Sequence, residues 1–170
     1  MPDIRSPTGI TPYGQGLFFN FEVEGEMQAK VYLVGLADRM RDMQPAWRRI
    51  KTILTQHTEQ RFRDEGGADS WWPPLAPTTI LEKQLLGFGD KGILERTGRL
   101  RYSFQGGRDH IYQVDRQSFV WGSRVPYGIY HQSHLPRRKL PRRAMIYIDK
   151  NVLSKIIQVI RRWIEYGVIQ

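Results

Sequence analysis

The sequence predicts an α+β fold, in which a small antiparallel sheet of three to four strands is packed by one long helix and one C-terminal helix. Two observations predict the helices: apolar residues recur at helical spacing between Trp47 and Phe62, and again between Val152 and Ile164. A third observation predicts the sheet, because four short segments are rich in β-branched and aromatic residues: 17–23, 111–114, 118–121 and 144–148.

The chain of 170 residues has the length of one domain. Residues 1–16 contain several prolines and glycines and no apolar segment typical of a signal peptide, so we expect an extended N-terminal arm. We expect residues 17–170 to form a single α+β domain. Its first element is a predicted strand at 17–23, whose buried face alternates through Phe19, Phe21 and Val23.

A first helix is predicted over residues 26–41. Its apolar positions follow helical spacing: Leu33, Leu36, Ala37 and Met40. Gly35 weakens this prediction, since glycine costs about 1 kcal/mol relative to alanine inside a helix. The β-branched start at 31–34 leaves a second interpretation open, in which this segment extends a hairpin from the preceding strand.

The longest helix is predicted between Asp42, which can cap its N-terminus, and Gly66-Gly67, which end it. Pro45 lies in the first turn, where a missing N–H costs little. A helix of about 20 residues spans roughly 30 Å, so we expect it to be the spine of the fold. Its predicted apolar face consists of Trp47, Ile50, Ile53, Leu54, His57 and Phe62.

An aromatic and proline-rich connection follows the long helix. Trp71 and Trp72 are expected to plug the core at the end of that helix. A short helix is predicted to begin at Pro77 and to run to Leu85, and residues 93–104 are predicted to form a second short element.

The second half of the chain begins with a predicted hairpin, because 111–114 and 118–121 flank the polar turn 115–117. One helical turn is expected over 127–131, and 144–148 is predicted to add a further strand.

The last helix is predicted to begin after Asp149 and to end at Gly167. Its apolar stripe is wide: Val152, Leu153, Ile156, Ile157, Ile160, Trp163 and Ile164. The helices together offer more apolar surface than one small sheet can cover, which is typical of a protein that assembles.

The net charge of +9 is unevenly distributed. Residues 1–93 contain 11 Lys/Arg against 12 Asp/Glu, whereas residues 94–170 contain 15 against 5. This asymmetry favours an anionic partner, either nucleic acid or an acidic protein surface.

The proline-containing loop 136–143 concentrates this charge. We expect its cations to contact a partner or DNA: Arg137, Arg138, Lys139, Arg142 and Arg143. Such a loop can contact phosphates, with binding that weakens steeply as salt rises, but a stiff cationic loop suits an acidic protein edge equally well.

The chain carries no recognisable catalytic motif. Cysteine is absent, and neither a G-x-S-x-G nor a phosphate-binding G-x-x-x-x-G-K-[ST] sequence occurs. His131 and His134 have too few neighbouring ligands to form a metal site, and we expect His57 to lie in the core or an interface. We therefore predict no catalytic, cofactor-binding or metal-binding residue, no enzymatic activity and no membrane partner.

Several short motifs, in order, resemble the phage virion morphogenesis family, which includes Mu-like tail-completion proteins. The first is Phe62, which lies at the end of a long predicted helix. It is followed by the patterns W-x-P-L, I-L-x-x-T-G-x-L and Y-x-x-Y-H-Q, and then by P-x-R. The matching residues are Phe62, Trp72, Pro74, Leu75, Leu94, Gly98, Leu100, Tyr127, His131 and Gln132.

The resemblance implies structural work without a cofactor, in a virion protein assembled in the host cytoplasm. It implies a homo-oligomeric ring, a hexamer by family analogy, at the neck or the head-proximal end of the tail. Its partners would be connector or neck proteins and tail-tube or tail-terminator proteins, with non-specific contact to DNA in the channel. The alternative that we retain is a basic nucleic-acid-binding protein that uses the loop 137–143.

Overall fold

The computed structural model describes residues 25–67, 70–133 and 140–169. The predicted arm, the predicted strand at 17–23 and residues 134–139 of the basic loop lie outside these ranges. In chain order the elements are α1 Glu26–Arg41, α2 Gln44–Arg63, α3 Pro77–Leu85, α4 Arg99–Tyr102, β1 His110–Val114, β2 Phe119–Ser123, α5 Gly128–Gln132 and α6 Lys150–Tyr166.

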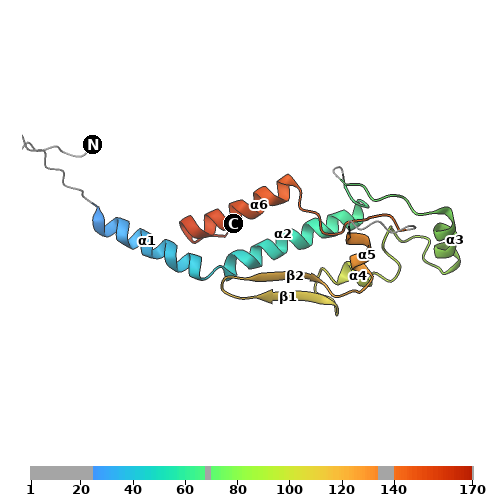
Figure 1. Ribbon diagram of the computed structural model, residues 1–170, viewed down its shortest axis with the longest axis horizontal. Helices are drawn as coiled ribbons and strands as arrows, with labels where there is room; N and C mark the ends of the chain where they lie inside the picture. The colour runs from blue at the N-terminus through green and yellow to red at the C-terminus, as the bar shows by residue number, and fades with distance from the viewer. Residues whose placement is uncertain (1–24, 68–69, 134–139, 170) are drawn as a thin grey trace, which may run out of the picture.

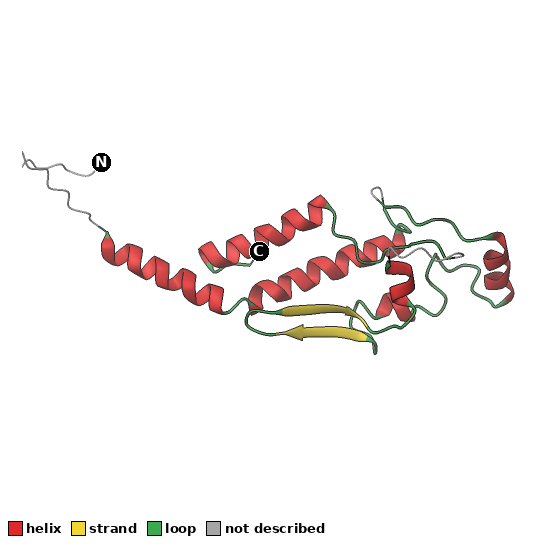
Figure 2. Cartoon of the chain, in the orientation of Figure 1, coloured by secondary structure: helices red, strands yellow, loops and turns green. Residues whose placement is uncertain are grey.

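The long helix α2 is the spine of an elongated α+β molecule (Figure 1). Helix α6 packs along one side of α2 and the β-hairpin lies along the other. Helices α4 and α5 gather near the C-terminal end of α2, α3 projects beyond them, and α1 extends from the opposite end (Figure 2).

The described part of the sheet has two strands rather than three or four. Strands β1 and β2 pair antiparallel, with His110 opposite Ser123 and Val114 opposite Phe119. The turn is closed by a hydrogen bond from the Asp115 amide to the Ser118 carbonyl (2.9 Å). The predicted hairpin is therefore confirmed, and it lies against α2 through the stacked rings of Trp47 and Phe119 (centroids 6.1 Å apart).

The prediction of a strand at 144–148 is wrong. This segment is extended between α5 and α6, but it pairs with no strand in the described part of the chain. Its backbone forms hydrogen bonds with three side chains instead of with a neighbouring strand: Arg61 of α2, Trp72 of the aromatic connection and Gln132 of α5.

Helix α1 forms as predicted, so the alternative hairpin interpretation of 31–34 is wrong. Its predicted apolar face, however, is not buried in the protomer. No residue of α1 is buried, and the Leu33 and Met40 side chains are 62% and 55% exposed.

The predicted long helix is confirmed with a different N-cap. Met43 is the N-cap residue of α2, while the Asp42 carboxylate accepts a hydrogen bond from the Gln44 amide (3.1 Å). At the other end, Gly66 has a φ of 119°, and a Cβ there would lie 2.5 Å from the Ser70 carbonyl oxygen. Only glycine fits this reversal, which turns the chain toward Trp72.

The other predicted helices are largely confirmed. Helix α3 begins at Pro77, and α5 covers the turn predicted after Pro126. The element predicted over 93–104 is helical only over the four residues of α4. Asp149 caps α6 by accepting a hydrogen bond from the Val152 amide (2.7 Å), and Gly167 ends α6 with a left-handed φ of 69°.

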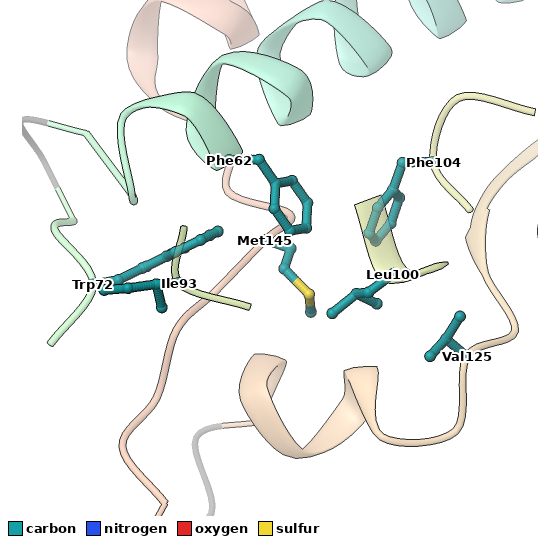
Figure 3. Close-up of a cluster of buried hydrophobic side chains, with 7 residues drawn as sticks. All are labelled: Phe62, Trp72, Ile93, Leu100, Phe104, Val125 and Met145. Carbon is teal, nitrogen blue, oxygen red and sulfur yellow. The ribbon is translucent and has the colours of Figure 1, made fainter. Parts of the chain in front are cut away.

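Two apolar clusters hold these elements together. One lies between α2 and α6 and is centred on the buried residues Met43, Ala46, Ile50 and Val159. The second lies at the C-terminal end of α2, where seven buried side chains from five segments converge (Figure 3). Its members are Phe62, Trp72, Ile93, Leu100, Phe104, Val125 and Met145.

Within the described ranges, no helix is long and apolar enough to cross a membrane.

Candidate functional site

The extended segment 144–147 is the point where distant parts of the chain meet. Gln132, the last residue of α5, holds it through three hydrogen bonds. Its Oε1 accepts from the Met145 and Ile146 amides (both 3.0 Å), and its Nε2 donates to the Ile146 carbonyl (2.7 Å). The Gln132 amide thus takes the place of a neighbouring strand beside 145–146.

Two further side chains converge on the Ala144 carbonyl oxygen. The Arg61 guanidinium donates to it from Nε (3.2 Å) and Nη2 (2.9 Å), and the Trp72 indole donates from Nε1 (3.0 Å). Arg61 is only 4% exposed and lies over the Tyr147 ring (5.0 Å). His57 completes the set, since its Nε2 lies 2.8 Å from the Tyr147 carbonyl oxygen. The sequence gives no signal for the burial of Arg61, because an arginine within a helix is normally solvated.

Arg143 does not belong to a solvated basic loop. Its side chain is 5% exposed, with Nε donating to the Pro73 carbonyl (2.8 Å) and Nη2 to the Pro74 carbonyl (2.9 Å). Burial lowers the pKa of this guanidinium. Arg143 therefore joins the connection to the last part of the chain inside the protomer, and its contact with a partner stays a prediction.

The remaining loop cations divide into two groups. Arg142 is half-buried, and its Nε donates to the Gln132 carbonyl (3.1 Å). Arg137, Arg138 and Lys139 lie outside the described residues, so their contact role stays a prediction.

An open groove of about 1150 Å³ runs beside this framework, between α3, the loop before α4, α5 and the start of 140–149. Its walls combine apolar side chains such as Leu86 and Phe88 with both signs of charge, including Glu95 and Arg96. Residues from the predicted motifs also line it: Pro74, Leu75, Leu94, Gly98, Leu100, Tyr127 and His131.

The structure thus brings all ten predicted motif residues into one region. Phe62, Trp72 and Leu100 lie in the core, and Leu75 and Leu94 pack against it. The other members line the groove or, for Gln132, hold the extended segment. These residues therefore contribute to the core, to the groove and to the attachment of the segment 144–147.

An ion-pair network fixes α4 to α2 near the same region. The Arg101 guanidinium binds both Glu59 and Glu95, with Nε 3.0 Å from Glu59 Oε2 and Nη1 2.6 Å from Glu95 Oε1. The hydrogen bond from Arg101 is the main reason that the pKa of Glu59 lies below its usual value of 4.5. No sequence signal predicts this network, because its members lie on separate elements.

Within the described ranges, no group of three or more His, Cys, Asp or Glu residues could hold a metal ion.

The model of the phage virion morphogenesis family matches residues 26–165. The chain belongs to this family. The match extends from the first residue of α1 to the last turn of α6, so it includes the core, the extended segment and the groove. No curated protein and no solved structure matches the chain.

Family membership indicates a structural role in phage virion morphogenesis and association with the virion. In this phage virion morphogenesis protein, the residues that carry the sequence resemblance support the framework rather than a reaction centre. Large apolar side chains are exposed on several elements, including Leu33 on α1, Leu85 on α3 and Ile129 on α5.

His131 makes the stability of the framework depend on pH. Burial, and then the charge of Arg143, holds the pKa of His131 below its usual value of 6.5, and its Nδ1 has no hydrogen-bond partner among the described residues. The unfolded chain therefore binds this proton more readily than the folded one. The stability that His131 contributes as a neutral ring is complete above pH 6.5 and is lost as the pH falls toward the lowered pKa.

We predict that this dependence disappears in His131→Gln. Between neutral pH and a pH below 6.5, the wild-type free energy of unfolding should fall more than that of His131→Gln in urea titrations. The other histidines are the same in both proteins, so the comparison isolates the contribution of His131. Equal losses of stability would mean that His131 takes up its proton without cost in the folded state.

Proposed function

We propose that this protein is a structural component of the head–tail junction, where it completes the tail and joins it to the head. It acts as a ring of identical copies, between connector or neck proteins on one side and tail-tube or tail-terminator proteins on the other. The observation that carries the proposal is the family match over residues 26–165. A sixfold ring is the copy number that family analogy favours.

The distribution of apolar side chains supports assembly. Large apolar residues remain exposed at opposite ends of the molecule: Val31 and Leu33 on α1, and Leu81 and Leu85 on α3. A monomeric protein rarely leaves such residues uncovered in several places. A head-to-tail contact between copies joins two different surfaces of the chain, and it forms a ring when the rotation between copies closes.

Depletion of the protein tests the proposal. A phage that lacks this gene product should produce DNA-filled heads and separate full-length tails, visible by electron microscopy, and few joined particles. Adding the purified protein to a mixture of these heads and tails should restore joined, infectious particles. Normal particles without the protein, or a failure to make tails at all, would contradict a role in joining.

The nucleic-acid alternative makes a different prediction. A stand-alone binding protein that uses Arg137, Arg138 and Lys139 would bind free DNA with an affinity that falls steeply with salt. Arg143, the fifth cation of this hypothesis together with Arg142, donates its hydrogen bonds to the Pro73 and Pro74 carbonyls inside the protomer. In our proposal, DNA contact is non-specific and limited to the channel, so joining should survive neutralisation of these three cations.

A further inference from the structure

A second groove, of about 460 Å³, lies between α2 and α6 and shares no lining residue with the groove beside α3. Each of its walls is one side of a helix. Arg49, Gln56 and Gln60 follow one another on α2 at intervals of seven and four residues, and Lys155 and Arg162 lie seven residues apart on α6. Residues at these intervals share one side of a helix, so each wall of this α2–α6 groove presents a continuous row of side chains.

The exposed lining of the α2–α6 groove has an unusual composition. Every exposed residue that lines it is an arginine, a lysine or a glutamine: Arg49, Gln56, Gln60, Lys155, Gln158 and Arg162. The apolar lining residues lie deeper, since Val152 and Val159 are buried and Ile53 is half-buried. The groove thus presents positive charge and amide groups above an apolar floor, and none of the described residues that line it carries a carboxylate.

The cations of the groove are also left without counter-charges. Within the described ranges, Arg49, Lys155 and Arg162 form no ion pair. By contrast, two exposed arginines on the same helices but outside the groove are paired: Arg63 with Glu59 (3.5 Å) and Arg161 with Glu165 (4.0 Å). Like charges that face one groove without carboxylates favour the binding of an anion there.

Two carboxylates lie beside the end of the groove that His57 and Gln60 form, and both have partners inside the protomer. Asp64 accepts from the Gln60 amide at both carboxylate oxygens (2.9 Å each). Asp149 caps α6 by accepting from the Val152 amide (2.7 Å), and it lies 3.9 Å from His57 Nε2. The free positive charge is therefore confined to the rest of the groove.

The direction of α6 determines which parts of the two walls face each other. Helix α6 runs antiparallel to α2 (Figure 1). Asp149, just before α6, lies beside His57, and Trp163, near the other end of α6, donates to the Asp42 carbonyl (2.9 Å). The chain positions 42–57 on α2 thus face 163–149 on α6 in reverse order.

This pairing spreads the three cations along the groove. Arg49, halfway between positions 42 and 57, lies beside residues 156–157 of the other wall and therefore between Lys155 and Arg162. The seven residues from Lys155 to Arg162 correspond to about 10.5 Å along the helix axis. A ligand that neutralises all three cations must consequently carry several negative charges over about this length, which a single small anion does not.

The phosphate backbone of DNA has this distribution of charge. Each strand of a double helix carries one phosphate per 3.4 Å of rise, so about three phosphates correspond to the length between Lys155 and Arg162. Arginine, lysine and glutamine side chains all donate hydrogen bonds to phosphate oxygens. The exposed lining of the groove consists of these three residue types alone.

Other polymeric ligands fit the groove less well. Proteins that bind single strands stack the bases on aromatic side chains, but the described lining contains no Phe, Tyr or Trp. The centre of a protein–protein interface is depleted of charge and enriched in aromatic residues, which is the reverse of this lining. The chemistry of the groove therefore favours double-stranded DNA over a single strand or an acidic protein.

We propose that the α2–α6 groove is a binding site for the phosphate backbone of double-stranded DNA, with Arg49, Lys155 and Arg162 as its charged contacts. The inference rests on the proposed function for the source of this DNA, which is the DNA that passes through the junction. It assigns the DNA contact to a surface other than the basic loop 137–143. Contacts to phosphates alone carry no sequence information, so binding is independent of sequence.

Fluorescence anisotropy of a labelled DNA duplex of mixed sequence, titrated with the purified protein at several salt concentrations, tests the groove. The logarithm of the affinity should fall with the logarithm of the salt concentration, with a slope of about −0.9 for each phosphate neutralised. The variant Arg49→Gln/Lys155→Gln/Arg162→Gln should flatten this slope by about 2.7 and weaken binding at least about tenfold at low salt. Its melting temperature should stay unchanged, because all three positions are exposed.

The matched control is Lys30→Gln/Arg48→Gln/Arg124→Gln. It also removes two arginines and one lysine from exposed positions, but none of the three lines the groove. The net charge of the two variants is the same, so the control should keep the wild-type slope. Arg49→Lys/Arg162→Lys retains the charges of the groove and should keep it as well. Equal flattening by the two glutamine variants, or no binding of the duplex by the wild type, would overturn the inference.

The remaining outcomes separate an acidic protein partner and the proposed function from this inference. A labelled decaglutamate peptide that binds the groove more tightly than the duplex at the same salt concentration would overturn it in favour of an acidic protein. If the protein lies at the junction but the groove variant binds DNA like the wild type, the inference fails and the proposed function stands. If the groove binds DNA as expected but phages without the protein are normal, the groove is supported and the role in joining fails.

Discussion

Trp72→Ala should lower the free energy of unfolding by about 3–5 kcal/mol, the range measured for large aromatic residues truncated in cores. The indole is 5% exposed and packs edge-on against the Phe62 ring, with centroids 5.3 Å apart. Its Nε1 also donates to the Ala144 carbonyl oxygen (3.0 Å). Truncation therefore leaves a cavity in the core and removes one of the bonds that hold the extended segment.

The neighbouring tryptophan is the natural control. Trp71 is 65% exposed, so Trp71→Ala should change the free energy of unfolding by no more than about 0.5 kcal/mol. The free energies of unfolding of the two variants and the wild type are compared by guanidinium chloride titration. Equal effects of the two substitutions would show that the chain does not place Trp72 in the core.

Gln132→Leu should destabilise the protein by at least about 3 kcal/mol, although leucine has a similar size. The substitution leaves the Met145 and Ile146 amides and the Ile146 carbonyl without the partner that Gln132 supplies. Each buried polar group left unsatisfied costs about 1–3 kcal/mol. The measurement is again the free energy of unfolding, taken from urea titration.

Gln158→Leu is the control for this experiment, since Gln158 lies on the exposed side of α6. It should change the free energy of unfolding by about 0.5 kcal/mol or less. A mild effect of Gln132→Leu, comparable to this control, would mean that water readily replaces the Gln132 amide and that the extended segment is not held from α5.

Local signals were sufficient to predict most of the helices. Asp149 and Gly167 delimit α6 because a cap and a left-handed glycine act on their own neighbours. The hairpin is likewise encoded locally, by two β-rich runs and a short polar turn.

The errors arise where the partner of a residue is distant in the chain. Alternation at 144–148 is typical of a strand, but the partners of this segment are side chains such as Gln132 and Arg61. Arg143 belongs to a run of charge, yet the Pro73 and Pro74 carbonyls that bind it are about 70 residues away. No local pattern shows whether a cation will find buried carbonyls.

The motif residues were identified from their order, but their roles required the structure. Phe62 and Trp72 pack together and Gln132 acts on the backbone of 145–146, so the motifs describe one framework rather than several contact sites. For helix α1, the sequence predicts the element but not what covers it. Its periodicity predicts a helix with apolar faces, but not whether these faces are covered by the same chain or by another copy.

The position of the protein in the finished particle tests the central claim most directly. Electron microscopy of virions that carry a gold-labelled C-terminal tag should place the label at the junction between head and tail. In preparations of tails without heads, the label should lie at the head-proximal end. Label on the capsid surface or at the distal tip of the tail, or virions that contain no copies of the protein, would contradict a role in joining head and tail.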